Sequence, residues 1–457
     1  MKKALYLSLL MLPAIAVAQT AWFKSAPAEY CWKNVGELGF SGGIALYTSL
    51  AFNPVTDQPY VGYSDSTHAQ RATVMKFDGT SWVNVGSPGF SAGKITFTSL
   101  AFSQAGVPFM AYTDYGSSYK ATVMKFDGTS WVNVGNPGFS NGYAQYTCLA
   151  FSPSGVPYVA YCDYMDEGAT VMKFDGTSWV NVGTAGFSGG MAFYISLAFS
   201  PDGQPHVVFK DEENSHKATV MKFDGTGWIP VGPAGFSAAE VAFTNIAFSP
   251  SGVPYVAYSD YGNSFRATVM KFNEPSWVTV GEPGFSTGFP DYASFAFSPG
   301  GQPYLAYEDE DNQAKATVMK FDGDRWALVG PQGFSSGEAE WTSLAFSSAG
   351  IPYVAFGDSL RGANVMKFDS VMVGVEERKT GDLTICPNPA KDLITIEPVS
   401  GNKENRLTII NAGGRSMINC PVYRTKASIN ISTWPAGVYF VRITNDNAVQ
   451  VGKIIKQ

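Results

Sequence analysis

A unit of about 49 residues occurs seven times along the sequence, and this repetition limits the possible folds more than any other feature. Each copy has a tryptophan at the same position, which opens a segment such as WVNVG at 82–86. The seven tryptophans are Trp32, Trp82, Trp131, Trp179, Trp228, Trp277 and Trp326. A unit this short cannot bury its own apolar face, so neighbouring copies must stack and share a core.

One complete unit, residues 49–86, contains four segments that are rich in β-branched and aromatic residues, at 49–52, 59–63, 72–77 and 82–85. Each is bounded by Gly, Pro, Asp or Ser, which is typical of short strands, and none has helical periodicity. Four short strands in a repeat of this length indicate a β-propeller blade. The sequence therefore predicts an all-β, seven-bladed β-propeller.

The two ends of the repeat array complement each other. The array begins with an isolated fourth strand at 32–35, and its last copy stops after a third strand at 363–368. We expect the N-terminal strand to complete the last blade, which pairs two edges that would otherwise invite aggregation.

The copies diverge on one face only. In a four-stranded meander, the first-to-second and third-to-fourth turns lie on one face, and the second-to-third loop and the blade-to-blade crossover lie on the other. The first pair is nearly constant, as in SPSGVP at 152–157 and 249–254, whereas loops such as 115–119 and 212–216 differ in every copy. Loops on a rigid scaffold commonly carry binding groups, so we call the divergent face the variable rim and expect function there.

Tyrosines and acidic residues are frequent among the variable positions and make the rim a candidate ligand-binding surface, with unconstrained drift as the alternative. Trp341 belongs to a column of seven aromatic residues, one before each inner strand, that either stack on a ligand or pack between blades. The candidate ligand-binding residues are Tyr115, Tyr119, Tyr143, Tyr164, Tyr261, Phe289, Trp341, Asp114, Asp163 and Asp260.

The three candidate aspartates belong to a column of seven that follow the second strand of each copy. A basic residue closes the same hairpin in five copies, which indicates an ion pair or an Asx turn that holds the loop. A ring of carboxylates that binds cations or sugar hydroxyls is the alternative. Calcium would find oxygen ligands in two acidic loops, although solvated acidic loops are commoner. The metal candidates are Asp211, Glu213, Asp309 and Asp311.

The sequence offers little for catalysis. It has no nucleophile elbow, phosphate-binding glycine loop or nucleotide fingerprint outside the turns, and its 3 histidines lack zinc-ligand spacing. Nearly identical blades also argue against a single asymmetric active site, so we assign no catalytic residue and favour binding over enzymatic activity. The net charge of −7, with the acidic excess in the repeats, argues against nucleic acid as a partner.

The first 18 residues read as a signal peptide, with Lys2 and Lys3, an apolar run and an A-x-A cleavage pattern before Gln19. No later segment has the roughly 18 apolar residues that a membrane span requires. We therefore expect a signal peptide at 1–18, the propeller at 19–370, a linker at 371–380 and a second domain at 381–457.

Five cysteines are too few for a disulfide scaffold, but an exported chain can carry an occasional bridge. Cys148 and Cys162 fall on neighbouring strands, and Cys386 and Cys420 fall in the C-terminal domain. Each pair is a candidate bridge, which leaves Cys31 unpaired, and the geometry that a bridge needs cannot be read from sequence.

Residues 381–457 carry PNPAKD at 387–392, LTIIN at 407–411, GVYFVRI at 437–443 and KIIK at 453–456. The segment resembles the type A C-terminal sorting domain of the bacterial type IX secretion system, a small β-sandwich. The resemblance implies a Bacteroidota-type bacterium, export across both membranes, and release or attachment at the cell surface, with the secretion machinery as a partner. The motif positions are Pro387, Asn388, Pro389, Gly437, Tyr439 and Lys453.

Together these features predict a secreted or surface-attached propeller whose variable rim binds an extracellular glycan or glycoprotein. A polysaccharide-active hydrolase or lyase is one alternative, and a non-enzymatic scaffold is the other.

Overall fold

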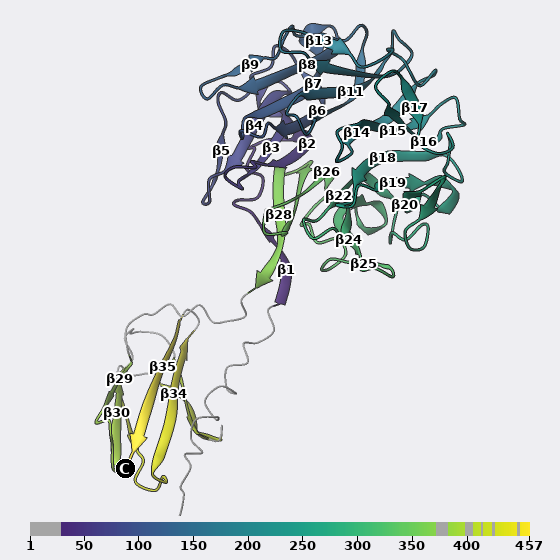
Figure 1. Ribbon diagram of the computed structural model, residues 1–457. Coiled ribbons are helices and arrows are strands. Elements are labelled where there is room, and N and C mark those ends of the chain that lie inside the picture. The colour runs from purple at the N-terminus through teal and green to yellow at the C-terminus, as the bar shows by residue number, and fades with distance from the viewer. Residues whose placement is uncertain (1–28, 372–382, 398–404, 413–414, 423–425, 446–447) are drawn as a thin grey trace, which may run out of the picture. The chain divides into compact units, whose positions relative to one another are not determined.

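The computed structural model describes residues 29–371, 383–397, 405–412, 415–422, 426–445 and 448–457 (Figure 1). The expected signal peptide lies outside these residues, as does all of the expected linker except position 371. The chain divides into one unit at Tyr30–Asp369 and a second that includes Ser370–Gln457. No helix in the described part of the chain has the length and apolarity needed to cross a membrane.

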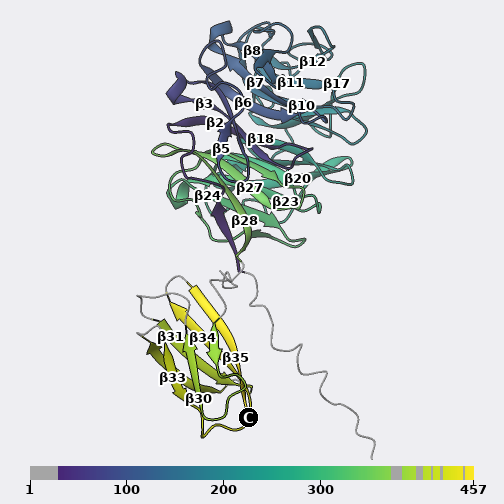
Figure 2. The same cartoon turned by 90° about the vertical axis from the view of Figure 1, so that its left-hand side faces the viewer.

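The first unit is the predicted seven-bladed β-propeller, whose antiparallel four-stranded sheets are arranged in a ring (Figure 1), and Figure 2 shows the same cartoon turned by 90°. Blades 1 to 3 consist of β2 (Ala45–Phe52), β3 (Pro59–Asp65), β4 (Arg71–Phe77) and β5 (Trp82–Asn84); β6 (Ile95–Phe102), β7 (Pro108–Asp114), β8 (Lys120–Phe126) and β9 (Trp131–Asn133); and β10 (Ala144–Phe151), β11 (Pro157–Asp163), β12 (Gly168–Phe174) and β13 (Trp179–Asn181).

The same strand order continues around the ring. Blades 4 to 6 consist of β14 (Ala192–Phe199), β15 (Pro205–Asp211), β16 (Lys217–Phe223) and β17 (Trp228–Pro230); β18 (Val241–Phe248), β19 (Pro254–Asp260), β20 (Arg266–Asn273) and β21 (Ser276–Thr279); and β22 (Pro290–Phe297), β23 (Pro303–Asp309), β24 (Lys315–Phe321) and β25 (Trp326–Leu328). Four second-to-third loops form short 3₁₀ helices: η1 (Ser66–His68), η2 (Tyr115–Ser117), η3 (Tyr261–Asn263) and η4 (Glu310–Asn312).

Blade 7 is completed by the N-terminal strand, as the ends of the repeat array predict. Its sheet has the order β1 (Glu29–Asn34), β28 (Gly362–Val371), β27 (Pro352–Asp358) and β26 (Glu340–Phe346). Beyond β1, the Val35 amide donates to the Val365 carbonyl at 2.8 Å. The outer strand of the last blade is thus supplied by the start of the chain.

The repeated tryptophans join the blades. The Trp82 indole N–H donates to the Val35 carbonyl at 2.6 Å, and its ring stacks on Phe40 with the centroids 4.3 Å apart. The joint that closes the ring is built in the same way, since Trp32 donates to the Val329 carbonyl at 2.7 Å and stacks on a phenylalanine at 4.0 Å. Each tryptophan therefore buries a large apolar surface and also satisfies its polar N–H.

The inner strand of every blade contains a β-bulge that the sequence pattern does not reveal. In β2 the register with β3 shifts between Leu46 and Ser49, and the strand begins at Ala45 rather than at the expected position 49. The aromatic residue at each bulge has φ between 42° and 56°. This left-handed conformation is unusual for a bulky side chain.

The second unit contains two antiparallel sheets that share one apolar core, in agreement with the predicted β-sandwich. One sheet has the order β29 (Thr384–Cys386), β30 (Leu393–Glu397) and β33 (Ala427–Asn430), and the other has the order β32 (Ser416–Val422), β31 (Asn405–Asn411), β34 (Gly437–Asn445) and β35 (Ala448–Lys456). Ile394 from the first sheet and Ile409 from the second are both fully buried in this core.

All five cysteines are free. Cys148 and Cys162 do lie on the neighbouring strands β10 and β11, but Cys148 is opposite Ala160, because the bulge in β10 shifts the register. Cys386 lies on β29 and Cys420 lies on β32, which belong to different sheets. Neither candidate bridge is present.

Candidate functional site

The variable loops and crossovers lie together on one face of the propeller. The Tyr115 amide donates to the Lys94 carbonyl at 3.0 Å, and the Tyr164 amide donates to the Tyr143 carbonyl at 3.1 Å. Equivalent bonds join loop and crossover in other blades, such as Glu310 to Phe289 at 3.3 Å. These backbone bonds fix the divergent side chains to the propeller framework.

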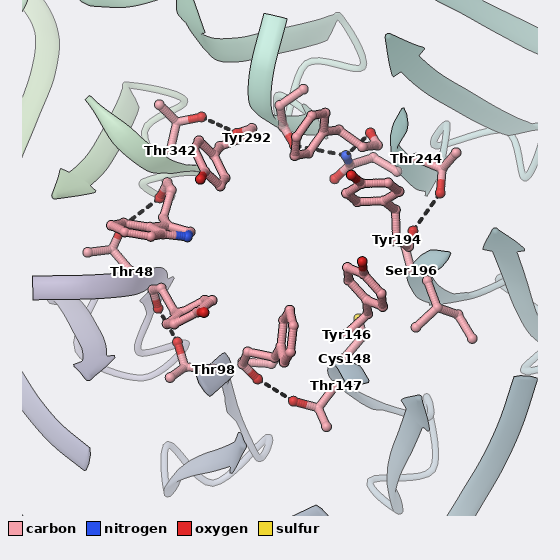
Figure 3. Close-up of a pocket in the computed structure, with 18 residues that line it drawn as sticks. Thr48, Thr98, Tyr146, Thr147, Cys148, Tyr194, Ser196, Thr244, Tyr292 and Thr342 are labelled. Atoms are coloured by element: carbon pink, nitrogen blue, oxygen red, sulfur yellow. Dashed lines mark hydrogen bonds between the residues drawn. The ribbon is translucent and has the colours of Figure 1, made fainter. Parts of the chain in front are cut away.

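Seven aromatic side chains form a closed ring at the central opening, which we call the aromatic ring (Figure 3). Its members are Tyr47, Phe97, Tyr146, Tyr194, Phe243, Tyr292 and Trp341. Neighbouring centroids are 4.7 to 5.6 Å apart, with the ring planes tilted by 40° to 59°. The rings line a cavity of about 280 Å³, and Tyr146, Tyr194 and Tyr292 point into it. Each side chain is half-buried, so it packs against its neighbours and still faces the cavity.

Side-chain hydrogen bonds reach the backbone carbonyls of six of the seven aromatic residues, and five of these bonds cross from one blade to the next. The Thr98 hydroxyl donates to the Tyr47 carbonyl, and the Thr48 hydroxyl donates to the Trp341 carbonyl at 2.5 Å across the boundary of blades 7 and 1. Asn245 bridges two carbonyls, those of Phe243 and Ala293, at 2.9 and 2.8 Å. Because these bonds cross from one blade to the next or span a bulge, they link the backbone around the cavity wall.

The tyrosine hydroxyls of the aromatic ring remain protonated at physiological pH. Burial raises the pKa of Tyr47, Tyr146, Tyr194 and Tyr292 above the ordinary value of 10.0. A neutral hydroxyl can both donate and accept a hydrogen bond. The cavity therefore offers aromatic surface together with uncharged polar groups.

Four of the sequence-predicted residues converge beside the ring in what we call the tyrosine cluster: Tyr115, Tyr119, Tyr143 and Tyr164. Successive centroids are 4.4, 5.5 and 5.2 Å apart, so the four rings form one continuous surface across blades 2 and 3. The Tyr164 hydroxyl donates to Gln145 at 3.2 Å, and the side chains of Tyr119 and Tyr164 are 47% and 44% exposed.

Two further predicted residues, Tyr261 and Phe289, lie apart from this cluster in blades 5 and 6. Phe265, which the sequence comparison did not single out, lies between them, with its centroid 4.6 Å from Tyr261 and 5.8 Å from Phe289. The Lys210 ammonium lies 5.6 Å above the Tyr261 ring. The remaining aromatic candidate, Trp341, is a member of the aromatic ring.

The predicted aspartates are buried and hold their own loops. Asp114 accepts from the Gly116 amide at 2.8 Å, Asp163 from the Met165 amide at 2.8 Å, and Asp260 from the Gly262 amide at 3.0 Å. Both oxygens of Asp260 are used, because Asn263 and Thr268 donate to the second one. These contacts are Asx turns, as one of the two structural interpretations proposed, and none of the three aspartates forms an ion pair in the described chain.

The four metal candidates do not converge. Asp211 and Asp309 are buried and accept hydroxyl hydrogens from Thr219 and Thr317 at 2.6 and 3.1 Å, whereas Glu213 and Asp311 are exposed. Within the described residues, no set of three or more His, Cys, Asp or Glu side chains is arranged as metal ligands. The described residues therefore give no support for a calcium site at these four positions.

Sequence reasoning missed a group of carboxylates at the boundary of blades 6 and 7, which we call the acidic pocket. Its members are Asp291, Glu308, Glu310, Glu338 and Glu340. Asp291 and Glu308 are directly opposite each other on β22 and β23. Burial and the neighbouring carboxylates raise the pKa of Glu308 to about 8, and that of Asp291 to about 6.

A signal for the acidic pocket was present in the repeat. The column that contains Glu308 has small or uncharged residues in five copies and a lysine, Lys210, in one. Glu308 is thus the only acidic residue at that position. Comparison of the charges column by column would have identified it.

In the second unit, Asn388 ties the start of the domain to its last strand. Its amide nitrogen donates to the Lys453 carbonyl at 2.6 Å, and its side-chain oxygen accepts from the Ile455 amide at 2.8 Å. Tyr439 is buried and donates to the Pro435 carbonyl at 2.8 Å. Pro387, Pro389 and Gly437 are exposed, and Gly437 begins β34; the Lys453 side chain is also exposed.

These features define a seven-bladed β-propeller joined to a β-sandwich. Residues 384–457 match the secretion system C-terminal sorting domain. The chain is therefore a cargo of the type IX secretion system, and it is exported to the cell surface or the extracellular space.

Comparison with curated proteins found no significant match. Among solved structures, the chain is similar to the extracellular domain of a putative hybrid two-component system from B. thetaiotaomicron, with 8% identity, a TM-score of 0.46, and coverage of 94% of this chain and 58% of that one. An α-L-arabinanase of Penicillium chrysogenum has 11% identity and a TM-score of 0.41, over 60% of this chain and 93% of that one. A family 25 polysaccharide lyase, an ulvan lyase, has 11% identity and a TM-score of 0.47, over 74% and 95% of the two chains.

Proposed function

We propose that the propeller binds an extracellular glycan on its variable rim, at the mouth of the central cavity. The observation that carries the proposal is the convergence of the aromatic ring and the tyrosine cluster on the face where the repeats diverge. Sugar rings present flat apolar faces that pack against aromatic rings, and their hydroxyls pair with neutral donors and acceptors. Tyrosine combines both properties in one side chain.

The tyrosine cluster is suited to repeated sugar units rather than to one small molecule. Its four rings form an extended surface instead of a closed pocket, and Gln145 adds an amide between Tyr143 and Tyr164. The exposed rings of Tyr119 and Tyr164 need little rearrangement to accept a ligand. Because the rings already contact one another, ordering them on binding costs less entropy than ordering four isolated side chains would.

A glycan array with the purified protein tests the proposal, and calorimetry with the best ligand then measures its affinity. Tyr119→Ala is expected to weaken binding by about 5- to 30-fold, because loss of one aromatic contact costs about 1–2 kcal/mol. Ile229→Ala is the matched control, since Ile229 is 39% exposed on the outer strand β17, and it should bind with unchanged affinity. Equal affinity of wild type and Tyr119→Ala for every ligand would contradict the proposal.

The same samples separate binding from turnover. Glycan that is bound without new reducing ends or unsaturated products indicates a binding protein. Product formation that depends on a rim carboxylate would instead establish the hydrolase or lyase alternative. Absence of binding to any glycan would favour the scaffold.

A further inference from the structure

The acidic pocket has no internal cation. The ion pairs among the described residues are His68 with Asp65, Lys210 with Glu240, and Lys367 with Asp369, and none of these involves the pocket. Its members range from exposed to buried: Glu310 and Glu338 are exposed, Asp291 and Glu340 are half-buried, and Glu308 is 4% exposed. The carboxylates therefore lead from the rim into the protein.

Two oxygen atoms at the base of the pocket have no partner. Glu308 Oε2 and Asp291 Oδ1 are shielded from solvent and make no hydrogen bond within the described chain. Their residues are opposite each other on adjacent strands, where side chains lie about 5 Å apart and like charges destabilise the pair. Buried polar atoms without a partner are rare in native proteins, so two of them on facing carboxylates call for a physical explanation.

The propeller contains its own example of an ammonium group at the equivalent place. Lys210 in blade 4 occupies the position of Glu308 in blade 6, and Glu240 occupies that of Glu338. The Lys210 ammonium donates to Glu240 at 2.5 Å across the boundary between blades 4 and 5. At the boundary of blades 6 and 7 the backbone positions are the same, but Glu308 and Glu338 are both acidic. No lysine side chain takes the place of Lys210 there.

The neighbouring aromatic side chains indicate what kind of cation fits. Tyr292 and Trp341 of the aromatic ring directly follow Asp291 and Glu340 in the sequence. The negative charges of Asp291, Glu340 and Glu308 contribute to the raised pKa of Tyr292, so its hydroxyl lies near all three carboxylates. No three carboxylates among the described residues are arranged as metal ligands, whereas an ammonium group can donate separate N–H hydrogen bonds to only one or two of them. Aromatic faces attract the same cations.

We propose that the acidic pocket binds the ammonium group of an amine-bearing sugar, as found in a deacetylated hexosamine polymer. The sugar ring lies against Tyr292 and Trp341, and its ammonium group takes the place that the Lys210 ammonium fills two blades earlier. This inference rests on the proposed glycan-binding function and specifies the chemical class of the glycan. Binding transfers a proton from Glu308 to solvent when Glu308 starts protonated, since the ammonium group stabilises its charged form.

The test compares two ligands that differ only in charge: a β-1,4-linked glucosamine hexamer and the fully N-acetylated hexamer, measured by calorimetry with the whole protein at pH 6.5. We expect the amine form to bind at least 10-fold more tightly, with an affinity that falls as salt is raised. Glu340→Gln and the isosteric Glu308→Gln should each remove most of this difference and leave binding of the acetylated hexamer unchanged. Glu213→Gln, an exposed acid in another blade, is the control and should change neither affinity.

Equal affinity for the two hexamers would overturn this inference while leaving glycan binding intact. Failure of both hexamers to bind would also overturn it, and the glycan array then decides whether the proposed function stands. Tight binding of hexalysine without binding of the glucosamine hexamer would overturn it as well, because the pocket would then recognise a peptide. Proton release, measured in two buffers of different ionisation enthalpy, is expected for the amine form and should disappear in Glu308→Gln.

Discussion

Replacing Glu308 by glutamine is expected to stabilise the propeller at pH 8.5 and to have little effect at pH 4. The cause is the raised pKa of Glu308, about 8 in the folded protein against an ordinary value of 4.5. Between these values the unfolded chain has lost the proton that the folded protein still holds. Stability therefore falls as the pH rises from about 4.5 to about 8, and the full penalty is present above that range.

The magnitude follows from the size of the shift. A pKa difference of one unit corresponds to about 1.4 kcal/mol, so the shift of Glu308 would cost about 5 kcal/mol if the pocket were fully shielded. Solvent reaches Glu310 and Glu338 and screens their repulsion, which reduces the expected penalty to about 2–4 kcal/mol. Glutamine has the same shape and no charge, so it avoids this penalty.

Urea denaturation at the two pH values measures the effect as a change in midpoint at constant slope. The pH-dependence of groups that do not interact with Glu308 cancels when the variant is compared with wild type at the same pH, so the difference reports on Glu308 and the carboxylates around it. Glu213→Gln, with an exposed side chain, should show no pH-dependent difference. A Glu308→Gln effect of equal size at pH 4 and pH 8.5 would refute the electrostatic reasoning, as would destabilisation at pH 8.5. The expected gain in stability would indicate that the acidic pocket lowers the stability of the folded protein and is retained because it serves a function.

Three further substitutions test the framework. Trp32→Ala should lower the free energy of unfolding by about 3–5 kcal/mol, measured by denaturation, because it removes a buried ring and a hydrogen bond at the closing joint; an unchanged midpoint would show that β1 is not needed for closure. Asp114→Ala should accelerate hydrogen exchange of the loop at 115–119 and cost about 1–3 kcal/mol, since the loop loses its Asx turn; unchanged protection would contradict this role. Asn388→Ala should reduce the free energy of unfolding of the sorting domain by about 2 kcal/mol, because it removes two hydrogen bonds to β35, and calorimetry should show a lower melting temperature. An unchanged melting temperature would mean that these two bonds contribute little.

The architecture could be predicted from the sequence because each blade is a local structure. The strands of a blade follow one another along the chain. A segment whose strand assignment is ambiguous in one copy can be assigned from the equivalent segments of the other copies. The unpaired fourth strand at 32–35 further predicted the closure of blade 7, which the pairing of β1 with β28 confirms. The sorting domain was predictable from motifs in a fixed order, and the family match confirms it.

The details of the site depended on features that pattern alone does not encode. The convergence of Tyr115, Tyr119, Tyr143 and Tyr164 requires the crossover of blade 3 to lie beside the loops of blades 2 and 3. The bulges at the aromatic ring depend on bonds between blades, such as that from Thr98 to the Tyr47 carbonyl. The sequence also could not show that the aspartates are buried in Asx turns. An Asx turn and an exposed ion pair both place an aspartate at this position.

The closing joint between Trp32 and Val329 also sets an order of events in folding. Its partners are 297 residues apart in the chain, whereas the joint between Trp82 and Val35 spans only 47. Closing the longer loop costs about 1.6 kcal/mol more chain entropy, since each doubling of loop length costs about 0.6 kcal/mol. The internal joints can therefore form as soon as each blade follows its neighbour, while the last joint must wait until blade 7 exists. We expect the first six blades to assemble as an open arc before β1 closes the ring.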